Sequence, residues 1–212
     1  MAVQTVATGV KAVRRHRGRA AALAVVPAAV ALLVTAAAGP APASAAEGKG
    51  PDVVAREAYF LPPAEAEPGD GLTYDPALVP AGAGAEVVEV ARNGKTRIWL
   101  SLTGLLPDRT YGAHVHTRPC GSSPDEAGPH YQNKPAPVQP STDPAYANPE
   151  NEAWLDVTTG PRGSAESSAH QDWRFRAGQA RSVVIHEHAT MRQPGEAGVA
   201  GAWLACLSVP FE

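Results

Sequence analysis

The chain has 212 residues, of which 44% are hydrophobic and 18% are charged. Residues 1–45 contain five basic side chains and no acidic one. The chain has 18 basic and 21 acidic residues in all, so residues 46–212 contain 13 basic and 21 acidic residues and have a formal charge of −8. Such an acidic chain, with scattered lysines and arginines, argues against nucleic acid as a partner, because phosphate contacts need clustered basic groups. The roughly 165 residues after position 45 allow one domain with a core.

The first segment has the composition of an export signal. A basic stretch from Arg14 to Arg19 precedes an apolar stretch from Ala20 to Ala38, and small residues follow at 43–45. The alternative is a membrane anchor, since the apolar stretch approaches the roughly 20 residues that a span needs. We favour a cleaved signal peptide over 1–45, because the stretch is Ala-rich, contains Pro27 and ends in Ala-x-Ala. We therefore expect a secreted, extracellular or cell-envelope protein without a stable membrane span after processing.

The next part of the chain divides at about residue 85. Pro, Gly, Ala and Glu dominate residues 46–84, so we expect a flexible N-terminal segment there, with one strand at 53–61. Two β-rich runs at 86–91 and 96–102 then flank Asn93-Gly94, which is the strongest short-range hairpin signal. Residues 85–212 are expected to form one domain.

Further strand signals continue to the end of the chain. They lie at 110–116, 153–159, 165–175, 181–189 and 200–209, separated by Pro and Gly. About eight antiparallel strands without a helix-length periodic stretch predict an all-β fold, a Greek-key β-sandwich or flattened barrel. Residues 117–152 form a long polar connection of the kind that is usually functional or disordered.

Four histidines stand out as metal-ligand candidates. His114 and His116 have a spacing of two, so in a strand both imidazoles point to the same face. An isolated pair of this kind is more often a polar solvent face, but His130 and His186 occur at a loop start and a strand end of the same β-domain. Imidazoles without thiolate or carboxylate suit Cu, Zn, Ni or Fe, and a tetragonal set of four favours Cu(II).

Both cysteines of the chain, Cys120 and Cys206, follow the signal. An oxidising compartment lets two lone thiols pair and persist, so we predict a disulfide between them. The alternatives are two buried free thiols or a thiolate metal pair.

These residues together resemble the copper/zinc superoxide dismutase family over about residues 86–211. The matching segments, in chain order, are Gly112 to His116, Cys120, Ala127 to His130, Ser182 to Glu187 and Gly201 to Cys206. The resemblance implies that His114, His116, His130 and His186 bind copper, that Cys120 and Cys206 form the family disulfide, and that superoxide anion is the substrate. It also implies catalytic roles for His130 and His186, of which His130 would take up a proton when copper is reduced.

The family's zinc site is expected to be absent. Residues 131–156 contain no histidine, Glu150 lies near the position of one zinc histidine, and Ala153 replaces the zinc aspartate. Thr190 stands where the family has an aspartate that links the two metal sites. We therefore expect one copper ion and no zinc, with Glu150 or Glu152 orienting the distal nitrogen of His130.

The active-site arginine that holds the superoxide anion in the family is also replaced. Trp203 occupies the position of the active-site arginine, and an indole offers only one N–H donor. Arg118 or Arg192 could supply a compensating charge near the site. His188, two residues after His186, is a candidate for the rim of the copper site because the two would share a strand face.

Three functions follow from these observations. The leading hypothesis is a secreted copper-only superoxide dismutase-like protein that converts superoxide to oxygen and hydrogen peroxide. The alternative is a copper-binding or copper-storage domain of the same fold without dismutase turnover, which Trp203 favours. A structural sandwich with vestigial histidines is the third interpretation. The sequence leaves open whether the protein forms a homodimer.

Overall fold

The computed structural model describes residues 50–212; the predicted signal peptide at 1–45 lies outside this range. One nine-stranded sheet runs in the order β6-β5-β8-β9-β2-β1-β3-β4-β7. The strands are β1 (Asp52–Leu61), β2 (Gly71–Thr73), β3 (Gly84–Arg92), β4 (Lys95–Thr103), β5 (Thr110–His116), β6 (Val157–Thr158), β7 (Ala165–Gln171), β8 (Ser182–His186) and β9 (Trp203–Ser208). Within the described residues, the single helical element is the 3₁₀ helix η1 (Pro124–Ala127), so the predicted all-β class is confirmed.

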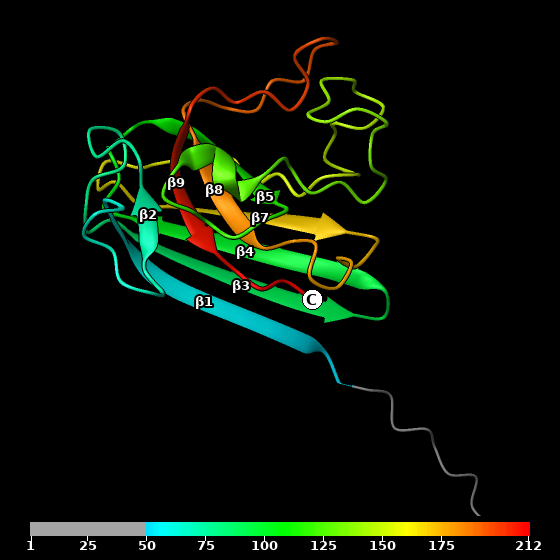
Figure 1. Cartoon of the computed structure of the whole chain (residues 1–212), viewed down its shortest axis with the longest axis horizontal. Coiled ribbons are helices and arrows are strands. Elements are labelled where there is room, and N and C mark those ends of the chain that lie inside the picture. The colour runs from blue at the N-terminus through cyan, green and yellow to red at the C-terminus, as the bar shows by residue number, and fades with distance from the viewer. Residues whose placement is uncertain (1–49) are drawn as a thin grey trace, which may run out of the picture. The chain divides into compact units, whose positions relative to one another are not determined.

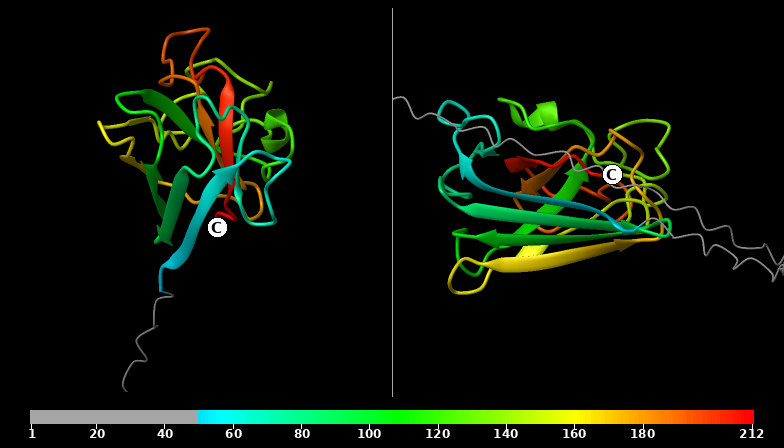
Figure 2. Two further views of the ribbon diagram at one scale, coloured as in Figure 1. Left: turned by 90° about the vertical axis from the view of Figure 1, so that its left-hand side faces the viewer. Right: turned by 90° about the horizontal axis from the view of Figure 1, so that it is seen from below.

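The sheet folds into two layers. The long strands β1, β3, β4 and β7 lie side by side in one layer, while β5, β8 and β9 lie in the other layer and cross them at an angle (Figures 1 and 2). The two ends of the strand order, β6 and β7, also contact each other, which nearly closes the sheet. The structure has nine strands where about eight were expected, and β1 pairs with β2 in parallel rather than antiparallel.

Alternating side chains fill the space between these layers. Inward positions of β3 and β4 are buried and outward positions are mostly exposed, as expected for strands with one solvated face. The largest fully buried apolar and aromatic side chains in this core are Phe60, Ile98, Leu100, Leu102, Tyr111, Tyr131, Leu155, Ile185, Leu204 and Leu207. No helix in the described range is long and apolar enough to cross a membrane.

The hairpin predicted at Asn93-Gly94 is confirmed. β3 and β4 pair up to Arg92 and Lys95, with Asn93 and Gly94 as the two turn residues. Their φ angles of 52° and 77° lie in the left-handed region that a type I′ turn requires, which Asn and Gly tolerate best.

The expectation of a flexible segment is wrong for residues 50–84. β1 pairs with β3 along eight residue pairs from Asp52 to Tyr59, and β2 pairs with Cys206 and Ala205 of β9. The strand predicted at 53–61 is confirmed as β1, and it pairs with β3 in the sheet of the domain. The low-complexity composition concealed this, because β2 is only three residues long and the buried anchors Phe60, Val79 and Ala83 are isolated in sequence.

Candidate metal centre

Strand β5 supplies two of the four histidines. His114 and His116 alternate with Val115, so both imidazoles leave the same face, and both are fully buried. β5 is flanked by β8 through the pairs His114↔Val184 and His116↔Ser182. The spacing-of-two argument therefore holds for this pair.

The other two histidines come from opposite sides of β5. His130 follows η1 and forms an isolated backbone bridge with His116, whereas His186 is the last residue of β8. One ring nitrogen from each of the four histidines lies within 4.8 Å of the other three. The Nε2 atoms of His116 and His186 are 3.3 Å apart. The structure thus brings together the four predicted ligands from three separate segments.

Hydrogen bonds determine which nitrogen each of three imidazoles presents. Nδ1–H of His116 donates to the carbonyl of Gly128 at 2.6 Å, and Nδ1–H of His130 donates to the Glu152 carboxylate at 2.9 Å. His114 has the opposite tautomer, because its Nε2 lies 2.6 Å from Thr190 Oγ1, whose own hydrogen goes to Asp156. The free nitrogens are therefore Nδ1 of His114 and Nε2 of His116 and His130.

These free nitrogens fit a metal ion. Nδ1 of His114 is buried and has no hydrogen-bond partner, which is costly for a polar atom unless a ligand uses it. Burial, followed by the charge of neighbouring imidazoles, holds the pKa values of His114, His116 and His186 well below their usual range. Neutral imidazoles are the form that binds metals. All four donors are nitrogens, a set that suits copper or zinc better than Mg²⁺ or Ca²⁺.

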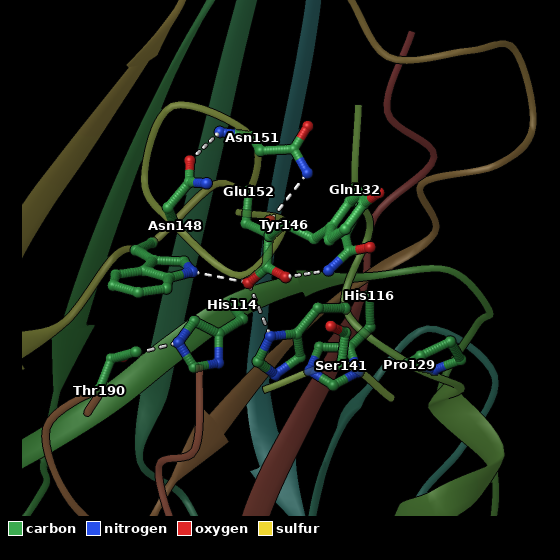
Figure 3. Close-up of polar contacts among 12 residues, drawn as sticks. His114, His116, Pro129, Gln132, Ser141, Tyr146, Asn148, Asn151, Glu152 and Thr190 are labelled. Atoms are coloured by element: carbon green, nitrogen blue, oxygen red, sulfur yellow. Dashed lines mark hydrogen bonds and ion pairs between the residues drawn. The ribbon is translucent and has the colours of Figure 1, made fainter. Parts of the chain in front are cut away.

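Glu152 takes the position behind His130. Its side chain is buried, and Oε2 accepts from His130 Nδ1–H at 2.9 Å and from Trp154 Nε1–H at 2.7 Å. The other oxygen, Oε1, accepts from Gln132 Nε2–H at 2.7 Å. Figure 3 shows the carboxylate held between Gln132 and the imidazoles. Three donors therefore fix one carboxylate on the side of His130 that faces away from the cluster.

Two predicted neighbours of the site lie elsewhere. The side chain of Glu150 is exposed, and its backbone carbonyl accepts from Trp173 Nε1–H. His188 is exposed and bonds its own neighbour, Ala189, through Nδ1. The shared-face argument does not apply to His188, because β8 ends at His186 and its pairing with β9 is irregular at Ile185/His186.

Thr190 links His114 to a carboxylate that the sequence did not reveal. Its hydroxyl donates to Asp156 Oδ1 at 2.6 Å, and its backbone N–H donates to Oδ2 at 2.8 Å. Asp156 also accepts from the backbone N–H of Ala113 on β5. The hydroxyl thus relays the orienting effect of a carboxylate to His114.

A cleft of about 210 Å³ opens the cluster to the surface. Trp203 lines it together with His130 and His186, and the Trp203 ring meets His116 edge-on, with 4.6 Å between ring centroids. No lysine or arginine of the described chain lines this cleft. Arg118 lies on the adjoining surface beyond Trp203 and Pro129, while the guanidinium of Arg192 lies over the Trp154 ring.

The predicted disulfide joins Cys120 and Cys206, and the described chain contains no free cysteine. Cys206 is buried on β9, and Cys120 begins the loop that carries η1 and His130. Ser208 of β9 adds a hydrogen bond to the backbone N–H of Cys120. The loop that carries His130 is therefore attached to β9.

Sequence reasoning missed three residues of the site: Gln132, Trp154 and Asp156. They lie in the irregular stretch between β5 and β6, where no periodicity indicates which side chains point inward. Trp154 is only 8% exposed, and its indole N–H donates to Glu152. In the sequence, the local sign of this contact is the spacing of two residues between Glu152 and Trp154.

Comparisons with known proteins give matches among solved structures only. No family model and no curated protein matches the chain. It is similar to a Cu/Zn superoxide dismutase from Brucella abortus, with a TM-score of 0.49 and 19% identity over 75% of this chain and 99% of that one. It is also similar to a double mutant of a superoxide dismutase-like protein from Bacillus subtilis, with a TM-score of 0.45 and 17% identity over 76% of this chain and 96% of that one. Both are described as superoxide dismutase or superoxide dismutase-like proteins, the kind that the histidine and cysteine motifs resemble.

Proposed function

We propose that the four-histidine cluster binds one copper ion and no zinc, and that the protein is an exported, copper-only superoxide dismutase-like enzyme. The observation that carries this proposal is the hydrogen bond from His130 Nδ1–H to Glu152. Because Nδ1–H of His130 donates to this carboxylate, Nδ1 is not free to bind a second metal ion. A site with one metal ion therefore still has a fixed His130 ring.

The choice of copper rests on the donors and their tautomers. Four imidazole nitrogens within 4.8 Å of one another suit Cu(II), and the buried, unpartnered Nδ1 of His114 supplies one of them. Bound copper would supply one-electron chemistry, accepting an electron from one superoxide and donating one to a second.

The residues around the ion would handle protons and access. His130 Nε2 would alternate between binding the ion and holding a proton, because Glu152 keeps the proton on Nδ1 and the ring in place. His130 also lines the cleft, from which a small anion would enter. His114 and His116 are fully buried and would keep their contacts throughout.

A second function is favoured by one observation. The cleft lacks a basic side chain within the described chain, and the Trp203 ring lies where an anion clamp would be. A domain that binds or stores copper without dismutase turnover would need no such clamp. The disulfide is consistent with an extracellular location for either function.

One experiment separates these functions. Copper-loaded protein is mixed with superoxide in a stopped-flow spectrometer, and its decay is compared with that in the His114→Ala variant and in free copper. Catalytic decay that His114→Ala abolishes supports the enzyme, whereas tight copper binding without catalysis supports the storage domain. Failure to bind copper, with no four-nitrogen signal by electron paramagnetic resonance, overturns both.

A further inference from the structure

The main chain that carries Glu152 lies outside the strands. It belongs to the connection between β5 and β6, and the N–H of Glu152 donates to the carbonyl of Asn148 at 2.9 Å. The Glu152 residue is nevertheless only 2% exposed, and its carboxylate lies 2.9 Å from His130 Nδ1. A contact of this kind orients a metal ligand only when the acceptor is itself held to within about 0.5 Å. The carboxylate can therefore orient His130 only if other residues hold this irregular segment in place.

The layer β1-β3-β4-β7 contributes such a contact through Gln171. Gln171 is the last residue of β7 and pairs with Thr96 of β4. Alternation along β7 turns its side chain into the interior, where the residue is 4% exposed. Its Nε2 donates to the carbonyl of Glu152 at 3.0 Å and to the carbonyl of Pro149 at 3.1 Å. The NH₂ group has two hydrogens, one for each of these carbonyls.

The amide of Gln171 has a specific use at this inward position. A buried amide is costly unless it is hydrogen-bonded, whereas an apolar side chain would be buried without that cost, as Ala169 is two residues earlier on β7. What the amide adds is a pair of donors directed at the segment 149–152. Trp173, two residues further along, donates its Nε1–H to the carbonyl of Glu150 at 2.8 Å. The segment is thus held from one side at three of its four carbonyls.

The other contacts of this segment come from the loop that also carries His130. The backbone N–H of Asn133 donates to the carbonyl of Asn151 at 2.9 Å, and the backbone N–H of Lys134 donates to Asn151 Oδ1 at 2.7 Å. These contacts join two irregular segments to each other. Gln171, in contrast, belongs to a strand, so its contacts fix the segment 149–152 relative to the sheet.

We propose that Gln171 is a positioning residue of the metal centre. Its hydrogen bond to the Glu152 carbonyl holds the main chain so that the Glu152 carboxylate accepts from His130 Nδ1–H and Nε2 remains directed to the cluster. Gln171 does not line the cleft, and it acts through Glu152. Where it concerns copper, this inference rests on the proposed function, but the contacts themselves require no ion.

The first measurement uses the metal-free protein. Gln171→Met keeps the length of the side chain and removes both N–H groups. In heteronuclear NMR spectra of the histidine side chains, the wild type should show His130 as the Nδ1–H tautomer, and Gln171→Met should show a mixture of the two tautomers. Thr73→Val is the matched control, because it removes a buried hydrogen bond to the carbonyl of Val79, and neither of these residues lines the cleft.

The second measurement uses the copper-loaded protein. Gln171→Met should bind copper about tenfold more weakly than the wild type and should change its electron paramagnetic resonance signal, because loss of an orienting partner typically weakens metal binding by about 10-fold or more. Thr73→Val should match the wild type in both respects. Each variant loses buried hydrogen bonding, so both should unfold at lower denaturant concentration. The tautomer and the copper signal therefore distinguish a positioning role from a merely structural one.

A wild type in which His130 is not the Nδ1–H tautomer overturns the proposal. An unchanged His130 tautomer in Gln171→Met, or an equal change in Thr73→Val, also overturns it. If Gln171→Met does not fold, Gln171→Asn, whose amide ends one methylene short of the carbonyls, should change the tautomer in the same direction, and no change overturns the proposal. A wild type that binds no copper overturns the proposed function alone, because the tautomer is measured without the ion.

Discussion

Glu152 accepts a hydrogen bond from His130 Nδ1–H at 2.9 Å. The same carboxylate accepts two more bonds, from Trp154 and Gln132, so its position is fixed before any ion binds. A fixed acceptor holds His130 in one tautomer, with Nε2 directed to the cluster. In the proposed single-metal site, this contact leaves Nε2 as the nitrogen of His130 that can bind the ion.

The first prediction is that Glu152→Gln weakens copper binding. A glutamine has one acceptor oxygen where three donors converge, so its NH₂ group must face at least one of them. Loss of such an orienting partner typically costs about 10–100-fold in metal affinity, which competition with a chromophoric chelator measures. Glu150→Gln is the matched control, because the Glu150 side chain is exposed. Equal affinities for the two variants would show that Glu152 does not orient His130.

Thr190→Val tests the second orienting contact. Valine has nearly the shape of threonine but cannot accept from His114 Nε2–H, which would stay buried without a partner. An unsatisfied buried donor costs about 1–3 kcal/mol, so the free energy of unfolding of the metal-free protein should fall by that amount. Chemical denaturation measures it, and Thr190→Ser should lie close to the wild type. An unchanged free energy of unfolding in Thr190→Val would mean that His114 finds another hydrogen-bond partner.

Part of the structure could be predicted from sequence by local rules that connect spacing to direction. Two-residue alternation places His114 and His116 on one face, and the Asn93-Gly94 turn fixes the β3–β4 register, and both hold in the structure. The family motifs supplied His130 and His186, which are distant in sequence. Copper, export and turnover remain predictions.

The remaining features depend on tertiary packing. Between β5 and β6 no periodicity shows which side chains point inward. The sequence therefore contains no indication that Asp156 and Gln132 belong to the site, and it does not distinguish Glu150 from Glu152 as the partner of His130. The same problem concealed the N-terminal strands. Phe60 and Val79 are buried only because β1 and β2 join the sheet, and nothing in the surrounding residues indicates this.

Trp203→Arg should increase the rate of superoxide decay and the affinity of the site for anions. The Trp203 ring lies against His116 and His186, and a guanidinium in its place would put the first positive charge in the cleft. A positive charge at a cleft raises anion association rates by a factor on the order of 10 or more, and the gain falls with ionic strength. We expect faster superoxide decay and tighter azide binding to the copper-loaded variant at low salt. Trp203→Leu is the control, because it opens the cleft without adding charge. If both variants respond alike, the tryptophan acts by blocking the cleft.

A last prediction concerns Glu89, which lies on β3 away from the metal centre. Its side chain points into the core, where Oε2 accepts from the backbone N–H of Glu212 and Oε1 has no partner. Burial raises the pKa of Glu89 from 4.5 to about 7, against the opposing effects of the Glu212 N–H and of Arg174. The folded protein therefore keeps this proton up to about pH 7, whereas the unfolded chain releases it from about pH 4.5.

Between these two pH values the folded state binds more protons, so raising the pH destabilises it, by at most about 1.4 kcal/mol per pH unit. Over the range from pH 4.5 to about pH 7 the total loss of stability is on the order of 3 kcal/mol. Glu89→Gln removes the ionisation, so it should stabilise the protein relative to the wild type above pH 7 and have little effect near pH 4. Denaturation at several pH values measures this, with Glu65→Gln, an exposed position, as the control. A difference between Glu89→Gln and wild type that does not grow with pH would mean that Glu89 ionises in the folded protein at its usual pKa.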